Sequence, residues 1–221
     1  MSAQSNLQDL IRLQTWLSPA FPTGGFSYSH GLEAAIASGL ISGNDNLKEW
    51  FEDLINSGPG WNDAVLLAES WRVAKDGKPL DGVCELATAI AFSKERYMEA
   101  TDQGRAFLLA AKAWGGVPSL PDACALPIAV GAVAGVQRVD LQQTLTAYLH
   151  AYMSNQIQAA LRLMKLGQQG GVELLASLEN IIIETAGRAA VSNLDDLGSN
   201  TFLADISAMQ HETMQSRIFR S

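Results

Sequence analysis

The spacing of apolar residues is the feature of this chain that most restricts its fold. From Leu47, apolar side chains fall at positions i, i+3, i+4, i+7 and i+8, which places them on one face of an α-helix. Asn44 or Asp45 can cap this helix, and Gly58-Pro59-Gly60 can end it. No stretch alternates convincingly with the period of two that is typical of a β-strand. The sequence therefore predicts an all-α protein.

Similar spacing, with proline and glycine as stop signals, predicts helices along most of the chain. Asp140 followed by Gln143 forms a capping box that opens the longest of them. Residues 125–136 are apolar on all sides and rich in Ala and Gly, so we expect a buried central helix there. The expected helices cover residues 7–17, 32–36, 47–55, 62–75, 80–100 and 103–114 (two helices or one bent helix), 125–136, 141–166 and 172–186.

These helices indicate a single domain. We expect residues 1–188 to form one helical bundle of about eight to ten helices, followed by a linker and C-terminal tail at residues 189–221. Within the tail, residues 193–200 are polar and are predicted to be an exposed linker. The apolar pair Ile218-Phe219 must dock either on its own domain or on another chain. We expect the tail to be mobile when no partner is bound.

Composition and charge limit the classes of partner. Hydrophobic residues make up 48% of the chain and charged residues 17%, which is typical of a globular protein and leaves apolar surface for a subunit interface. The net charge of −8 argues against nucleic acid, since phosphate binding requires clustered Lys and Arg. The longest apolar run, 123–136, is too short to span a bilayer, and residues 1–7 show no signal peptide. We therefore expect a cytoplasmic protein with no membrane partner.

Common catalytic and metal-binding patterns are missing. His30, His150 and His211 are far apart, so no metal site is predicted, and each is expected to be a helix-surface or capping histidine. Cys84 and Cys124 lack CxxC spacing and are predicted to be buried thiols in a reducing compartment. There is no P-loop and no nucleophile elbow. Distant residues can still converge in space, but nothing indicates a cofactor or an enzyme.

A charged stretch and a glycine mark the predicted helices between residues 80 and 114. Residues 94–99 read as an exposed helical face with i, i+3 ion pairs. Gly104 lies inside a predicted helix, where it costs about 1 kcal/mol relative to Ala. Close helix packing or the approach of a partner can offset that cost, and we favour packing.

Residues 18–33 form the most unusual stretch. Two prolines and three glycines shape it as a loop. It is either an ordinary connection between helices or a surface for a partner. Phe21 and Phe26 can anchor the loop to the core. The groups most able to contact a partner are Tyr28, Ser29, His30 and Glu33.

Four segments in order resemble the UreF family of urease accessory proteins. They are residues 18–33, residues 96–107 with Gln103-Gly104-Arg105, residues 162–168, and residues 207–221. The resemblance implies an all-α cytoplasmic protein that forms a homodimer. It also implies an adaptor that acts with UreD (also called UreH) and the GTPase UreG to insert nickel into apo-urease. In the family the tail engages UreD, which makes Arg217, Phe219 and Arg220 candidates for that contact.

The predicted partner-binding residues come from the loop and from these segments. They are Phe21, Phe26, Tyr28, Ser29, His30, Glu33, Arg105, Arg162, Lys165, His211, Glu212, Arg217, Phe219 and Arg220. The family tail often has an aromatic residue just before Ser216-Arg217, where this chain has Gln215. Two other functions stay open. One is direct regulation of GTP hydrolysis by UreG, with Arg105 or Arg162 as an arginine finger, and the other is a helical interaction module outside urease maturation.

Overall fold

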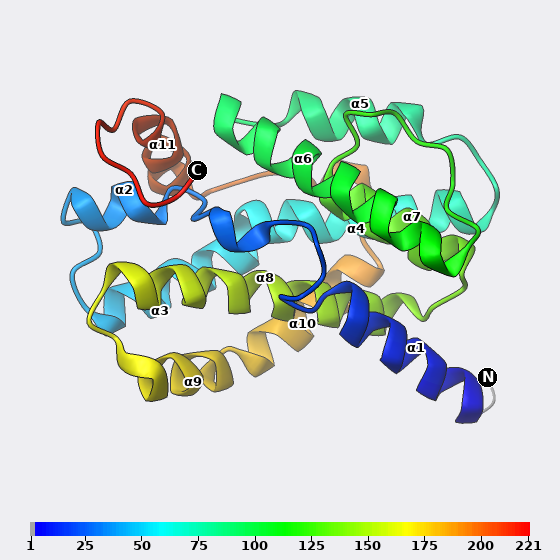
Figure 1. The fold of residues 1–221 in the computed structure, drawn as a ribbon, viewed down its shortest axis with the longest axis horizontal. Coiled ribbons are helices and arrows are strands. Elements are labelled where there is room, and N and C mark those ends of the chain that lie inside the picture. Colours follow the sequence, from blue (N-terminus) through cyan, green and yellow to red (C-terminus); the bar gives the residue numbers. More distant parts are fainter. Residues whose placement is uncertain (1–2) are drawn as a thin grey trace.

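The computed structural model describes residues 3–221, and over that range it is helical without strands, which confirms the predicted fold class (Figure 1). The α-helices are α1 (Ala3–Trp16), α2 (Leu32–Ala37), α3 (Asn44–Ser57), α4 (Pro59–Lys75), α5 (Asp81–Ala89), α6 (Lys94–Ala111), α7 (Leu126–Val136), α8 (Leu141–Leu163), α9 (Gly167–Ser177), α10 (Glu179–Ala190) and α11 (Phe202–His211). Short 3₁₀ helices lie at η1 (Gly25–Ser27), η2 (Lys112–Trp114) and η3 (Leu194–Asp196). None of the helices described is both long and apolar enough to cross a membrane.

Helix α7 is the buried central helix that its composition predicted. It packs against α4 and α6, and almost all of its residues are buried. A Cβ at Gly131 would overlap the carbonyl oxygen of Leu67, and one at Gly135 would overlap that of Trp71. Small residues therefore let the α4 and α7 backbones approach closely. A hydrogen bond from Ser70 Oγ to the Ile128 carbonyl, at 2.7 Å, ties the two helices together.

Several predicted boundaries were wrong. The break between α5 and α6 falls at residues 90–93, where the buried Ser93 caps α6 by accepting a hydrogen bond from the Arg96 amide. Residues 172–186 belong to two helices, because the chain turns at Leu178, which is fully buried. Helix α3 begins at Asn44 and is preceded by Gly43, so neither Asn44 nor Asp45 is its cap. The capping role of Asp140 is confirmed, since its carboxylate accepts from the Gln143 amide at 2.9 Å.

Gly104 on α6 packs against another segment of the backbone. A Cβ at this position would overlap the carbonyl oxygen of Cys124, just before α7. The packing interpretation of Gly104 is therefore confirmed. Cys84 and Cys124 are both buried free thiols, also as predicted.

The C-terminal segment is docked on the helical domain, and its mobility without a partner stays a prediction. Residues 193–200 are mostly exposed, but Trp61 Nε1 donates to the Asp196 carbonyl at 2.8 Å and fastens them to α4. Helix α11 then packs on α2 and α6, and the chain returns across the start of α2 (Figure 1). Phe219 is buried in the core, whereas its neighbour Ile218 is exposed. The apolar pair therefore docks on its own domain through one member only.

Candidate functional site

The loop before α2 turns sharply at His30 and Gly31. His30 has φ 54° and Gly31 has φ 79°, in the left-handed region that non-glycine residues seldom occupy. A Cβ at Gly31 would overlap the backbone of Ala208 on α11. Left-handed backbone at a histidine is costly and is found mainly where the surrounding structure requires it. Here it brings the His30 side chain into the core.

His30 belongs to a group of buried and partly buried polar side chains that we call the polar core cluster, consisting of His30, Asp63, Arg96, Glu99 and Tyr148. His30 Nε2 donates to Glu99 Oε1 at 2.7 Å, and Arg96 donates to the other Glu99 oxygen at 2.8 Å. Arg96 also donates to His30 Nδ1. Tyr148 donates to Asp63 Oδ2 at 2.8 Å. The Glu99 carboxylate on α6 thus joins this helix to His30 in the loop before α2.

Burial and ion pairing shift the ionisation of this cluster. Burial raises the pKa of Glu99, but Arg96 and His30 outweigh that effect and hold it at about 2. Burial and the nearby Arg96 lower the pKa of His30, so the imidazole is neutral near pH 7. Burial raises the pKa of Asp63 despite Arg96 and Tyr148. The cluster therefore contains a charged Arg96–Glu99 pair and a neutral histidine.

Small cavities lie on both sides of the polar core cluster. One, of about 80 Å³, is lined by loop residues 16–26 and by α6 and α8, and the other, of about 60 Å³, by α4, α6 and α11. His30, Asp63 and Arg96 line both. Within residues 3–221, no three His, Cys, Asp or Glu side chains are grouped so that they could hold a metal ion.

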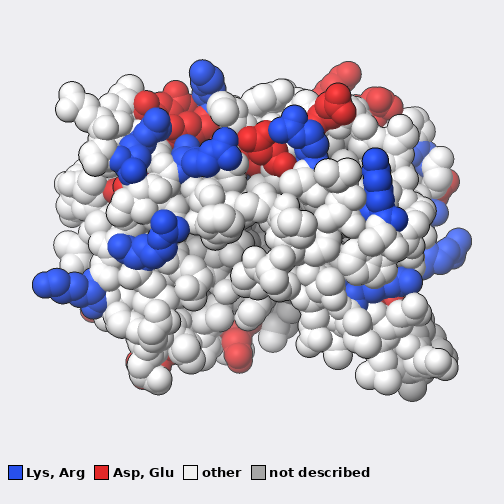
Figure 2. Space-filling view, viewed as in Figure 1, with Lys and Arg blue, Asp and Glu red and all other residues white. Residues whose placement is uncertain are grey.

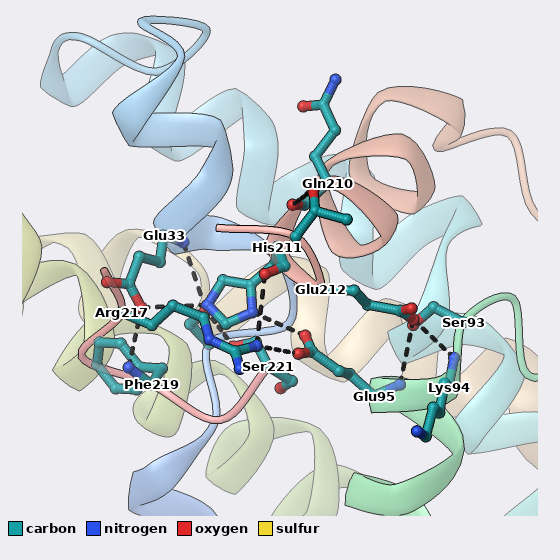
Figure 3. A network of polar contacts seen from close by, with 12 residues as sticks. Glu33, Ser93, Lys94, Glu95, Gln210, His211, Glu212, Arg217, Phe219 and Ser221 are labelled. Atoms are coloured by element: carbon teal, nitrogen blue, oxygen red, sulfur yellow. Dashed lines mark hydrogen bonds and ion pairs between the residues drawn. The ribbon is translucent and has the colours of Figure 1, made fainter. Parts of the chain in front are cut away.

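A second polar group, which we call the tail clamp, consists of Glu33, Glu95, His211 and Arg217 (Figure 3). His211 is fully buried between the two carboxylates, with Nδ1 2.7 Å from Glu95 Oε2 and Nε2 3.2 Å from Glu33 Oε2. Arg217 pairs with the other oxygen of Glu95. The clamp therefore contains two carboxylates and two side chains able to carry positive charge.

Glu33 binds the backbone of the tail directly. Its two oxygens accept from the amides of Ile218, at 2.7 Å, and Phe219, at 2.9 Å. Burial raises the pKa of Glu33, but these amides and His211 outweigh it and the net pKa is lowered. Glu33 therefore holds the tail as a carboxylate.

Ser221 connects the tail to the polar core cluster. Its main-chain oxygen accepts from the amide and the hydroxyl of Ser29, at 2.8 and 2.5 Å, and its hydroxyl donates to Glu99 at 2.8 Å. Phe219 lies under the guanidinium of Arg162, with the ring centroid 4.2 Å from Cζ. The same guanidinium donates to the Phe26 carbonyl at 3.0 Å. The four segments that carry the family resemblance thus meet at one place.

The structure corrects several expectations about the predicted site residues. Tyr28, Ser29 and Glu33 are buried, the His30 side chain is 11% exposed, and all four are engaged within the chain, so none presents a free surface. The prediction of surface or capping histidines is wrong for His30 and His211, because their partners lie more than 60 residues away in the sequence. It holds for His150, which is exposed on α8.

The two loop phenylalanines behave differently. Phe21 is buried against Phe107 and Trp114, with ring centroids 5.4 and 6.1 Å apart, and it anchors the loop as predicted. Phe26 is 70% exposed, so its prediction as an anchor was wrong. It lies in the short 3₁₀ helix η1, none of whose residues is buried.

The remaining predicted residues are exposed. Arg105 pairs with Asp102 at 2.8 Å, and Arg220 extends over the ring of Tyr28. Lys165 is exposed just before α9. Glu212 accepts from the Lys94 amide at 2.8 Å, at the first turn of α6. Figure 2 shows charged side chains of both signs along the upper edge of the face seen in Figure 1, above a broad uncharged area.

The sequence interpretation missed Glu95, Arg96 and Glu99, because residues 94–99 were read as an exposed face. Arg96 and Glu99 form an i, i+3 pair as expected, but Glu99 is buried. A signal was present in the spacing, since Glu99, Gln103 and Phe107 follow one another at i, i+4 and i+8. All three are buried on one face of α6.

Comparison with known proteins gives a consistent result. The UreF family model matches residues 41–179. The urease accessory protein UreF of Brucella ovis is 53% identical over 214 residues, covering 96% of this chain and 94% of the relative. UreF of Mesorhizobium japonicum is 50% identical over 223 residues and covers both chains completely. Together with the all-helical fold, these similarities show that the chain belongs to the UreF family of urease accessory proteins.

Proposed function

We propose that this chain is a non-catalytic adaptor in urease maturation, which works in the cytoplasm with UreD and the GTPase UreG while nickel is inserted into apo-urease. Residues 189–221 serve in this proposal as the partner-binding segment of one helical domain. The observation that carries it is the exposed apolar face of α11, made up of Phe202, Leu203, Ile206 and Met209, which adjoins the docked tail. An apolar face of this kind on a soluble domain favours a protein partner.

UreD is the partner that we assign to this surface. Burying two large apolar side chains of α11 in an interface contributes about 3–6 kcal/mol, at about 1.5–3 kcal/mol each. Phe202 is 69% exposed and Ile218 is 59% exposed, so both can be changed without opening the core. These two positions therefore separate partner binding from folding.

The test is co-purification with UreD and measurement of the dissociation constant. Phe202→Asp and Ile218→Asp should each weaken binding at least about tenfold, which corresponds to about 1.4 kcal/mol. Val172→Asp is the matched control, because Val172 is 64% exposed on α9, outside residues 189–221. Binding of both α11 and tail variants at the control level would refute the proposed surface.

For the homodimer we propose the groove beside α1. This groove has a volume of about 1090 Å³ and lies between α1, α8 and α10, with Leu7 and Leu10 in its wall. Ile11 projects from the same helix and is exposed. Ile11 of one copy can therefore enter the groove lined by Leu7 and Leu10 of the other copy, and the reverse. Such a contact is self-complementary, as a two-fold dimer requires. Ile11→Glu should shift the protein from dimer to monomer in light scattering, and an unchanged mass would exclude this face.

Regulation of GTP hydrolysis is the second candidate function. Arg105 is 66% exposed and pairs with Asp102, so its guanidinium can reach a bound partner. Arg162 is held by the Phe26 carbonyl and the Phe219 ring. If the chain supplies an arginine finger, Arg105→Ala should abolish any acceleration of UreG turnover. Turnover that is independent of this chain would favour the adaptor alone.

A further inference from the structure

His30, which is 11% exposed, and His211, which is fully buried, have different hydrogen-bond surroundings. His30 lies between a donor, Arg96, and an acceptor, Glu99, which suits a neutral ring with one N–H. His211 lies between two acceptors, since Glu95 and Glu33 face its two nitrogens at 2.7 and 3.2 Å. A neutral ring would leave one nitrogen lone pair opposite a carboxylate. Only the imidazolium donates to both.

The charges around His211 lead to the same conclusion. The charged groups facing it are Glu33 from α2, Glu95 from α6 and Arg217 from the tail. With an imidazolium, this group of four carries no net charge. With a neutral imidazole, one negative charge is uncompensated at a site where His211 is completely buried. Buried charges without a partner are strongly unfavourable.

The same two carboxylates hold the tail. Glu33 accepts from the amides of Ile218 and Phe219, and Glu95 pairs with Arg217. If His211 is neutral, its nitrogen lone pair repels the carboxylate that it faces. The contacts of that carboxylate with the tail then weaken as well. The protonation of His211 and the docking of residues 212–221 are therefore linked.

We propose that His211 is a proton-dependent latch for the C-terminal tail. Docking of residues 212–221 onto Glu33 and Glu95 takes up one proton at His211, and loss of that proton releases the tail. Because the docked state binds one more proton, docking is favoured at lower pH and weakens as the pH rises. The latch is a property of the isolated chain, so its test requires no partner and is independent of the proposed function.

NMR of the full chain provides the test. The protein has three histidines, so only the signals of His30 and His150 have to be distinguished from those of His211. The imidazole shifts of His211 and the hydrogen exchange of the Ile218 and Phe219 amides are followed between about pH 5.5 and 9, where a free histidine titrates. We expect His211 to carry both protons wherever these amides are protected. Over the pH range in which docked His211 keeps a proton that the undocked histidine has lost, the docking constant should fall about tenfold per pH unit.

Two variants and a control sharpen the result. His211→Gln should make tail protection weaker and independent of pH in this range, and Glu95→Gln should move tail release to lower pH. Glu184→Gln, on the exposed face of α10, should behave as the wild type. A neutral His211 with protected tail amides would overturn the proposal, as would wild-type pH dependence in His211→Gln. If His211→Gln does not fold, the wild-type titration alone decides.

Discussion

Replacing Glu99 by Gln is the substitution whose effect on stability the structure defines most closely. Glu99 is 1% exposed and accepts hydrogen bonds from His30, Arg96 and Ser221. An ordinary glutamate pKa is 4.5, and in the folded protein it is held at about 2. That difference corresponds to about 3 kcal/mol of stability near pH 7. Glutamine keeps the shape but points an NH₂ group toward donors, and it leaves Arg96 buried without its carboxylate.

We therefore expect Glu99→Gln to lower the free energy of unfolding by about 3 kcal/mol, measured by urea denaturation with tryptophan fluorescence at pH 7. The midpoint of thermal unfolding should fall by about 6–12 °C for a chain of this size. Because the folded-state pKa is depressed, the stabilisation is fully present above about pH 4.5. It is lost as the pH falls through about 2.

The pH dependence separates this effect from simple loss of packing. Wild-type stability should decline between about pH 5 and 2, and the contribution of Glu99 to that decline should be missing in Glu99→Gln. Glu184→Gln, at an exposed position on α10, is the control and should match the wild type. A loss below about 1 kcal/mol, or an unchanged acid profile in the variant, would refute the reasoning.

Three further substitutions test other contacts. Gly104→Ala should destabilise the protein by about 2–3 kcal/mol in urea denaturation, because the new Cβ overlaps the Cys124 carbonyl and this outweighs the gain in helix propensity. A stabilised variant would show that α6 and the segment at Cys124 can move apart at little cost. Phe219→Ala should release the tail, detected as faster amide exchange over residues 212–221, since it removes a buried ring and its stacking with Arg162. Glu212→Ala should lower the free energy of unfolding by about 1 kcal/mol, because it removes a cap from α6. No change in urea denaturation would mean that Ser93 alone is enough to cap this helix.

Local patterns predicted the helices well where one face is apolar. The spacing from Leu47 to Ile55 located α3, and the small apolar residues at 125–136 located α7 and its burial. Boundaries were less predictable, because the break before α6 depends on a single capping serine, Ser93, and on its burial. The turn at Leu178 likewise depends on the packing of that residue in the core.

The candidate site was only partly predictable. The segments that form it were identified by resemblance, but the sequence did not show that they meet. Glu33 and Glu95 each contact residues more than 100 positions away, so no short-range pattern predicts their burial. Charged residues are rarely buried unless paired, and the pairing partner is known only once the fold is known. For that reason His30 and His211 were assigned to the surface.

The long separation between the tail and its binding residues has a consequence for biosynthesis. Ser29 and Glu33 are made early, but their partners Ser221, Ile218 and Phe219 emerge from the ribosome about 190 residues later. Until then these buried polar groups have no tail to bind, so the loop and α2 cannot reach their final packing. We therefore expect the docking of residues 212–221 to be a late step of folding, and chains that lack these residues to be cleaved more readily by proteases in α2.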